Sequence, residues 1–338
     1  MRTTAELEDH LSRPRDGLVE DLAKIDGDIL VLGAGGKLGP SLVRLALNGI
    51  KAAGGGKRVI AVSRFSEPGL ARRLSDEGAT VVAADLADEA ALQKLPDVPN
   101  VVFLVGAKFG TDGREHATWF TNAYLPGRVA DRFAGSRIAA LSTGNVYPLV
   151  PVTSGGSAEG SPTGPVGDYA MSCLGRERVF TYFAEKHGTP TALIRLNYAV
   201  EMRYGVLVDL AQKILAGQPI DLTTGQVNVV WQGYANEVTL RALLLASAPP
   251  YVLNVTGPEL VSVRQVATEL GSLLGREPVF TGEEAPTALL SNASRCHGLF
   301  GYPGLTLAEL VEHTARWVGD GGPLLGKPTK FERRDGAF

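Results

Sequence analysis

Cysteine, long apolar runs and an excess of either charge are what this sequence lacks. Its 338 residues include two cysteines, Cys173 and Cys296, which is too few for a disulfide framework, and a single bridge is not expected in a chain of this size. No stretch approaches the roughly 18 uninterrupted apolar residues of a membrane-spanning helix. Lys and Arg number 33 against 36 Asp and Glu. This balance excludes a strongly basic nucleic-acid binder and an acidic tail.

The N-terminal segment, MRTTAELEDHLSRPRD, also lacks the apolar core of a signal peptide. We therefore expect a cytoplasmic protein that contacts neither membrane nor nucleic acid. Residues 1–27 are predicted to form a helical extension of one or two short polar helices. The helical pattern breaks near Pro14 and Gly17, and the extension is expected to pack on the edge of the main domain.

Glycine is abundant, with 41 residues, and much of the excess falls in turns between apolar runs and helical stretches. Short, continuous apolar runs separated by amphipathic helices are typical of a parallel sheet that is covered on both faces. Right-handed crossovers then favour a doubly wound α/β sheet, the Rossmann architecture. The predicted strands are 28–34, 58–64, 80–85, 100–107, 137–143 and 191–197.

Beyond residue 198 the alternation loosens, which predicts a smaller C-terminal lobe interleaved with the first domain. We expect a dinucleotide-binding domain over 28–197, to which 224–257 returns, and a substrate-binding lobe and tail over 198–223 and 258–338. The last part of that tail, GGPLLGKPTKFERRDGAF, is rich in Pro and Gly. It is expected to lie along the surface.

The sequence GAGGKLG follows the first predicted strand and places Gly33, Gly36 and Gly39 three residues apart. In such a turn the first glycine permits the tight bend, the second lets a pyrophosphate approach the backbone, and the third lets helix and strand pack closely. The helix N-terminus that follows offers N–H groups to an anion. Lys37 and Leu38 belong to the same turn, so a dinucleotide site is predicted here.

The second predicted strand ends in Ser63 and Arg64 rather than in the Asp that would bind the ribose hydroxyls of NAD. Because a guanidinium binds phosphate in bidentate fashion, these residues favour NADP, with NAD as the alternative. A solvated surface charge is the other interpretation of Arg64. Asp85 and Leu86 end the third strand, where they are expected to meet the adenine. Asp85 could equally cap the helix that starts near residue 88.

Three features together resemble the extended short-chain dehydrogenase/reductase family. They are the glycine spacing, the fifth-strand segment STGNVYP, and the helix that begins at Tyr169 with Glu177 two turns further on. More narrowly, the chain resembles the NAD(P)-dependent sugar epimerases and dehydratases, over about residues 28–320. The resemblance implies hydride transfer at a carbinol carbon of a sugar or sugar derivative.

The resemblance also implies roles for individual residues. The family's catalytic tyrosine falls on Tyr169, and the Ser or Thr that polarises the substrate oxygen falls on Thr143. Asn197 matches a position beside the nicotinamide. The segment VGAKFG resembles the turn that lines the cofactor, and its first four residues are expected to flank the dinucleotide: Val105, Gly106, Ala107 and Lys108.

One departure concerns the chemistry, because the family's lysine four residues after the tyrosine is Cys173 here. Without a neighbouring ammonium the phenol is a weaker base. Lys108 is the first candidate for the missing cation and joins Tyr169 and Thr143 as a predicted catalytic residue. Arg176, Arg195 and the oxidised nicotinamide are the alternatives. Cys173 itself could be a small buried filler, a mark of a binding protein without turnover, or a reactive thiol.

The predicted function is therefore an NAD(P)-dependent oxidoreductase or epimerase/dehydratase acting on a small sugar-like substrate. The alternative is a dinucleotide-binding protein with little or no catalysis, a sensor or scaffold. No metal is expected, because adjacent Cys296 and His297 make a poor zinc site. A homodimer stays open as the assembly.

Overall fold

The computed structural model describes residues 1–108 and 113–336, and in this part of the chain seven parallel strands form one sheet. The strand order is β12-β7-β5-β4-β1-β2-β3. The chain runs outward from β1 to β3 and then outward from β4 to β12, so the order reverses between β1 and β4. The expected doubly wound sheet is confirmed. The strands are β1 (Ile29–Leu32), β2 (Val59–Ser63), β3 (Thr80–Ala83), β4 (Asn100–Phe103), β5 (Arg137–Thr143), β7 (Thr191–Leu196) and β12 (Tyr251–Val255).

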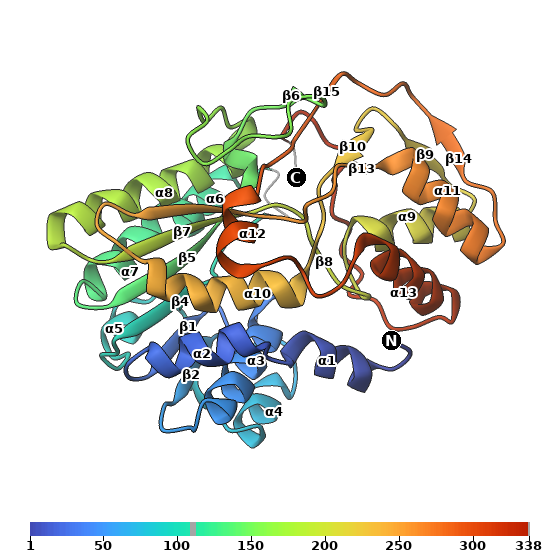
Figure 1. Cartoon of the computed structure of the whole chain (residues 1–338). Helices are drawn as coiled ribbons and strands as arrows, with labels where there is room; N and C mark the ends of the chain where they lie inside the picture. Colours follow the sequence, from blue (N-terminus) through green and yellow to red (C-terminus); the bar gives the residue numbers. More distant parts are fainter. Residues whose placement is uncertain (109–112, 337–338) are drawn as a thin grey trace.

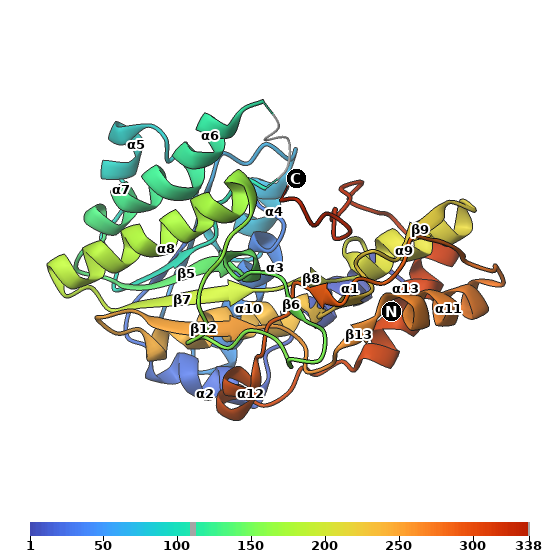
Figure 2. The same ribbon diagram turned by 90° about the horizontal axis from the view of Figure 1, so that it is seen from above.

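Helices cover both faces of the sheet, because successive apolar side chains of each strand point to opposite sides. Ile29 and Val31 belong to a core shared with one helical layer, and Leu30 and Leu32 to a core shared with the other. Figure 2 shows the two layers above and below the sheet. The first layer contains α2 (Asp16–Lys24), α3 (Gly39–Ala52), α4 (Leu70–Asp76) and α10 (Gln232–Arg241); the second contains α5 (Glu89–Gln93), α7 (Leu125–Arg132) and α8 (Gly167–His187).

The N-terminal extension forms two helices, α1 (Thr4–Ser12) and α2. The break falls beside Pro14 as expected, but Gly17 lies inside α2, so the expected break at this glycine is wrong. A Cβ at position 17 would lie 2.9 Å from the guanidinium of Arg241, which packs there. Arg15 donates to Glu237 of α10 at 2.7 Å. The extension therefore docks firmly on the first helical layer (Figure 1).

The smaller lobe lies beyond the carboxyl ends of the strands and is built on α9 (Val206–Leu215), α11 (Val263–Leu274) and α13 (Leu307–Gly319), which pack against one another. β9 (Pro219–Asp221) pairs with β14 (Val279–Thr281) at its edge. The other short elements are α6 (Glu115–Trp119), a π-helical turn (Phe120–Tyr124), 3₁₀ turns (Gly144–Val146, Ala242–Leu245), β6 (Val150–Pro151), β8 (Ala199–Val200), β10 (Gln226–Val227), β11 (Val230–Trp231), β13 (Val261–Ser262), β15 (Thr287–Ala288) and α12 (Ser294–Phe300).

The C-terminal tail, residues 321–336, is more than the surface segment that its composition predicts. Thr329 and Phe331 are each only 2% exposed. The carboxylate of Asp209 in α9 accepts from both the backbone N and the Oγ1 of Thr329, at 2.8 and 2.6 Å. Gly336 then packs on Gly167 at the start of α8, where a Cβ would lie 2.6 Å from the Gly336 carbonyl oxygen. The tail therefore runs from the small lobe back to the sheet domain (Figure 2).

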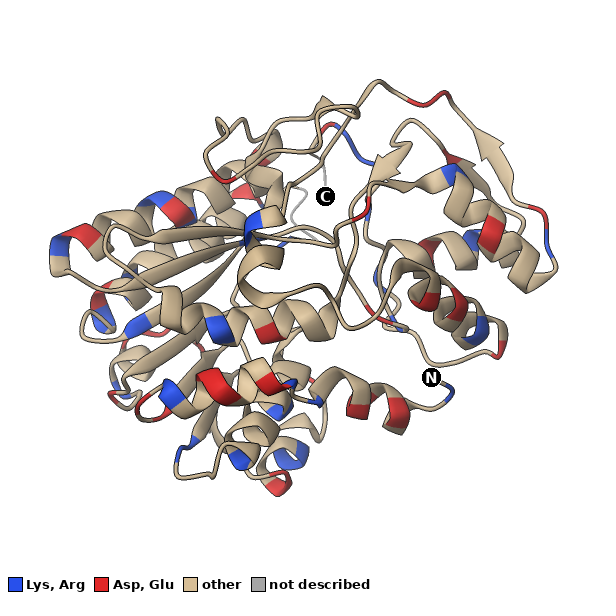
Figure 3. Cartoon of the chain, in the orientation of Figure 1, with Lys and Arg blue, Asp and Glu red and all other residues tan. Residues whose placement is uncertain are grey.

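Charged residues of both signs are interspersed over the helices, and the strands of the sheet are almost free of them (Figure 3). No helix in the described ranges is long and apolar enough to cross a membrane. Strand β12 belongs to the sheet although it follows the first segment of the small lobe, so the two parts interleave along the chain. The exact division of the chain into a dinucleotide domain and a substrate lobe stays a prediction.

Candidate active site

The glycine-rich turn after β1 is shaped by three glycines with different constraints. Gly33 has φ +93°, a conformation that favours glycine. A Cβ at Gly39 would lie 2.4 Å from the Ala34 carbonyl oxygen, so helix α3 packs directly on the turn. A Cβ at Gly36 would have one neighbour within 4 Å among the described residues, the Gly33 carbonyl oxygen at 3.2 Å. Gly36 is thus the position where the backbone is open to a ligand.

A cavity of about 360 Å³ lies beside this turn, at the carboxyl ends of β1 to β4. Most of the predicted cofactor residues line it: Gly33, Gly36, Ser63, Arg64, Asp85, Leu86, Val105 and Gly106. Further lining residues that sequence reasoning missed are Gly35, Ser66, Ala84, Ala87, Leu104, Phe120, Thr121 and Leu125. We call this space the dinucleotide cavity.

At the end of β2, the Arg64 side chain is exposed on the rim of the dinucleotide cavity. Asp85 accepts from the backbone N of Ala87 at 3.0 Å, and it is Asp88 that caps α5 by accepting from Ala90 N at 2.9 Å. The interpretation of Asp85 as the helix cap is therefore wrong. Asp85 instead shapes the turn at the cavity wall.

A second cavity of about 180 Å³ lies next to the first, at the ends of β5 and β7, and is called here the reaction cavity. Among predicted residues it is lined by Lys37, Leu38, Lys108, Thr143, Tyr169 and Asn197. Its other lining residues are Leu141, Ser142, Asn145, Leu196, Tyr198, Ala199, Tyr204, Gly205, Val206 and Thr329.

Six of the predicted cofactor residues are absent from the lining of the dinucleotide cavity, and two of them, Tyr169 and Asn197, line the reaction cavity. Lys37 and Leu38 line the reaction cavity instead, because the turn presents them to the small lobe. Gly39 lines neither cavity and packs on Ala34. Ala107 is held through its backbone, whose N donates to Asn122 Oδ1 and whose carbonyl accepts from Asn122 Nδ2, both at 2.9 Å.

Thr143 and Tyr169 come from two neighbouring elements and meet in the reaction cavity. Thr143 ends β5, and Tyr169 occupies the first turn of α8. Burial raises the pKa of Tyr169 well above its ordinary value, and Cys173 adds to the rise. A hydrogen bond with the Thr143 side chain and the charge of Arg176 act in the opposite direction. The tyrosine is therefore a neutral phenol that is hydrogen-bonded to the threonine.

The three candidate cations are placed differently. Lys108 lines the reaction cavity, with its Nζ 5.7 Å from the centre of the Tyr169 ring. Arg176 is buried and donates to the Leu141 carbonyl at 2.7 Å. Arg195, one of the alternatives, forms a 2.7 Å ion pair with Glu177 and donates to the Tyr147 hydroxyl at 2.8 Å.

Cys173 is 1% exposed and packs with Val146 and Tyr147 in a small apolar cluster. Burial raises the pKa of its thiol above the ordinary value. An uncharged buried thiol is a poor nucleophile. This position therefore supplies packing beside the tyrosine and no cation.

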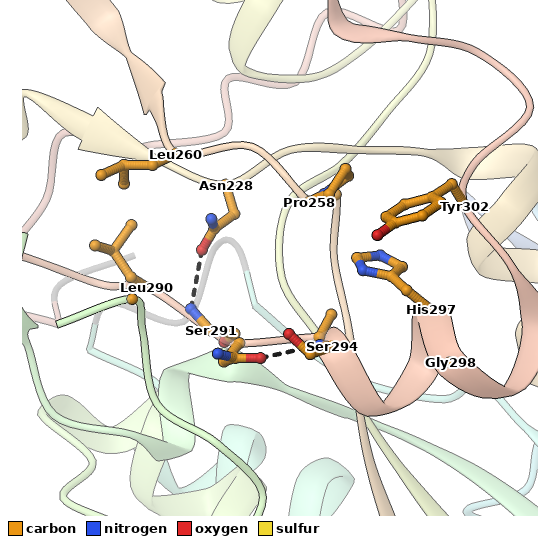
Figure 4. Close-up of a pocket in the computed structure, with 13 residues that line it drawn as sticks. Asn228, Pro258, Leu260, Leu290, Ser291, Ser294, His297, Gly298 and Tyr302 are labelled. Atoms are coloured by element: carbon orange, nitrogen blue, oxygen red, sulfur yellow. Dashed lines mark hydrogen bonds between the residues drawn. The ribbon is translucent and has the colours of Figure 1, made fainter.

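Another cavity lies apart from these two, with a volume of about 540 Å³ beside α12. Figure 4 shows the His297 ring next to Tyr302, and Asn228 accepting from the Ser291 backbone. His297 faces the Thr256 carbonyl at 3.1 Å. In the described ranges no three His, Cys, Asp or Glu side chains gather as a metal site. None of the predicted site residues lines this cavity.

The fold and the two adjoining cavities define a Rossmann-type protein with a tyrosine and a threonine beside a nucleotide-sized space. The model of the NAD dependent epimerase/dehydratase family matches residues 29–232, well over half of the chain. The chain belongs to this family. Among curated proteins no sequence matches it.

Solved structures agree on the fold. UDP-glucuronic acid 4-epimerase from Bacillus cereus in complex with NAD superposes with a TM-score of 0.71 at 19% identity, over 87% of this chain and 98% of that one. DesIV, a dTDP-glucose 4,6-dehydratase from Streptomyces venezuelae with NAD and TYD bound, gives 0.73 at 19% identity, over 87% and 97%. Pal from Bacillus thuringiensis gives 0.72 at 15%, over 87% and 99%. At these identities the likeness concerns the fold alone.

Proposed function

We propose that this protein is an NAD(P)-dependent enzyme that transfers hydride at a carbinol carbon of a sugar or sugar derivative, as an oxidoreductase or as an epimerase/dehydratase. The observation that carries the proposal is that Thr143 and Tyr169 line one cavity, which adjoins the dinucleotide cavity. The residues of the glycine-rich turn fit a dinucleotide, because Gly36 leaves room for a pyrophosphate and α3 begins there. A bound nicotinamide would supply the hydride acceptor.

The chain's own residues would hold the reacting oxygen and move its proton. Thr143 would donate to or accept from the substrate oxygen at the end of β5. Tyr169 would take the hydroxyl proton as hydride leaves, and return it in the reverse direction. Since burial disfavours the phenolate, a cation has to offset part of that cost. Lys108 is the residue we assign to this role, because it lines the same cavity.

Replacing Tyr169 by Phe tests the assignment. Loss of a general acid–base group costs about 10²–10⁴-fold in turnover, and the affinity for the cofactor should hardly change. Stopped-flow or steady-state absorbance of the reduced nicotinamide measures turnover, and a cofactor titration measures the affinity for the cofactor. Tyr182→Phe is the matched control, since Tyr182 is 60% exposed on the same helix. Unchanged turnover in Tyr169→Phe would contradict the catalytic role.

For the cofactor we propose NADP, with NAD as the alternative. Arg64 and Ser63 occupy the end of β2 on the rim of the dinucleotide cavity, where a 2′-phosphate would lie. We expect Arg64→Gln to weaken NADP binding by about tenfold or more, since a charge-assisted hydrogen bond is lost, and to leave NAD affinity nearly unchanged. Fluorescence titration with both cofactors measures this, with Arg72→Gln, 88% exposed in α4, as the control. Tighter binding of NAD by the unaltered protein would contradict it.

A binding protein without turnover is the second candidate. It is favoured by one observation, the neutral thiol of Cys173 in place of the family's lysine beside a phenol whose pKa is already raised. Such a protein would bind the dinucleotide normally and would neither reduce it with a substrate nor convert a sugar to an epimer or a dehydration product. Tyr169→Phe would then leave every measurable property unchanged.

We also propose a homodimer that forms through the outer face of α8 and the turn before α7. Tyr124 and Tyr182 are 60% exposed and Met171 is 47% exposed there. Apolar residues gathered on one face favour a protein contact. Sedimentation equilibrium of the unaltered chain measures the mass.

A further inference from the structure

We infer that the substrate is a small carbohydrate acid, free of any nucleotide, whose carboxylate binds between Lys37 and Lys108. The inference rests on the proposed function, because it assigns the substrate of the same reaction cavity. Three features of that cavity carry it: the charges of its lining, the surroundings of Lys37, and the tail that closes it.

The described lining of the reaction cavity contains two lysines and no Asp or Glu. The other polar groups in it are neutral hydroxyls and amides, those of Ser142, Thr143, Asn145 and Asn197 among them. A concave site of one charge sign attracts the opposite charge. Neutral sugars would need the hydroxyls and amides but neither ammonium group.

Lys37 is the more telling of the two lysines. Its Nζ donates to the Ala199 carbonyl at 3.0 Å and lies 3.3 Å from the centre of the Tyr204 ring. Glu201 lies near enough to favour its charge, yet forms its ion pair with Arg203 at 3.0 Å. Over residues 1–108 and 113–336 no carboxylate forms an ion pair with Lys37. An ammonium held in this way has donors left for a bound anion.

Burial lowers the pKa of Lys37 to about 7, and that of Lys108 to about 8. The charge of Lys108 is a further cause that lowers the pKa of Lys37. Two buried ammonium groups at one cavity attract an anion. A carboxylate between them gains charge-assisted hydrogen bonds.

The tail sets the size of the ligand. Thr329 forms part of the cavity wall, and its two hydrogen bonds to Asp209 fix it to the small lobe. The cavity volume is about 180 Å³, which is below the roughly 300–1,000 Å³ of sites for drug-sized ligands. A sugar acid fits such a space, whereas a nucleoside diphosphate would extend beyond it.

The test measures binding as well as turnover. Isothermal titration of the cofactor-loaded protein with gluconate, glucuronate, glucose and UDP-glucuronate should show binding of the two free acids. Lys37→Met should weaken acid binding by about 10- to 100-fold, since a charged hydrogen-bond donor is lost. Lys51→Met, an exposed lysine on α3, should leave it unchanged. Titration of Lys108→Met with the same acids tests the second lysine of the cavity in the same way.

The outcomes separate the inference from the proposed function. Equal binding of gluconate by Lys37→Met and the unaltered protein, or tighter binding of glucose or UDP-glucuronate than of the free acids, overturns the inference. Reduction of the nicotinamide by a neutral or nucleotide-linked sugar would overturn it as well, and would leave the proposed function standing. Binding of the acids with neither reduction of the nicotinamide nor conversion of the acid to an epimer or a dehydration product would support the inference and contradict the proposed function.

Discussion

The two adjoining cavities differ in how the chain builds them. The dinucleotide cavity is made by consecutive strand ends and by backbone, with glycines at the closest approach. The reaction cavity gathers side chains from the glycine-rich turn, from β5, from α8 and from the C-terminal tail. The first therefore depends on local sequence and strand order, and the second on tertiary contacts between distant segments. This difference predicts which substitutions will affect each ligand.

The largest expected effects come from two glycine substitutions in the turn after β1, which test whether its glycines have different roles. Gly39→Ala should destabilise the fold by about 1–3 kcal/mol, because its Cβ would lie 2.4 Å from the Ala34 carbonyl oxygen. Gly36→Ala should cost little stability, since its closest neighbour would be at 3.2 Å, and should weaken cofactor binding by about tenfold. Urea unfolding and cofactor titration separate the two effects. Similar results for both variants would contradict distinct roles.

Most of the first cavity could be predicted from the sequence. Apolar runs that end in glycine or in small polar residues mark strand ends, and strand ends of a parallel sheet meet at one edge. Ser63 and Asp85 were placed on this ground and Val105 by the resemblance of VGAKFG to a family turn, and all three line the cavity. Phe120 and Thr121 were missed, because a π-helical turn leaves no recognisable period in the sequence.

The second cavity was predictable only where a family motif carries the residue. Thr143 and Tyr169 follow from their motifs, but the direction of Lys37 does not, since the turn alone does not show that its side chain faces Ala199 and Tyr204. Thr329 gave no signal at all. Its place in the wall depends on a tail that returns over the lobe to Gly167.

A pH series sharpens the contrast, because one cavity contains titrating lysines in its lining and the other does not. Lysine is charged below its pKa, so raising the pH from about 6 to about 9 passes the values near 7 and 8 of Lys37 and Lys108 and removes positive charge. Gluconate affinity should fall by about tenfold or more over this range, and glucose affinity should not change. Burial raises the pKa values of Glu201 and Asp209. Their ionisation on raising the pH adds negative charge and would also lower the affinity for gluconate, while Arg203 stays charged.

The control for the pH series is Lys37→Met, in which the fall should begin near the pKa of Lys108 alone. Calorimetry at constant ionic strength measures this, since salt screens the attraction. Gluconate affinity that is flat with pH in the unaltered protein would contradict a carboxylate between the two lysines.

The smallest expected effect on ligand binding concerns the tail and tests whether the reaction cavity depends on it. Thr329→Val keeps the side-chain shape but removes the 2.6 Å hydrogen bond to Asp209, and leaves the backbone bond at 2.8 Å in place. Because the acceptor is a charged group, the loss should lower the free energy of unfolding by about 1.5–3 kcal/mol. It should also raise the KM for the acid several-fold and leave cofactor affinity unchanged, since Thr329 lines only the reaction cavity of the two. Thr268→Val, on the exposed face of α11, is the matched control. Equal effects of Thr329→Val on cofactor binding and on acid binding would mean that the two cavities are not independent. That result would contradict a specific role of the tail at the reaction cavity.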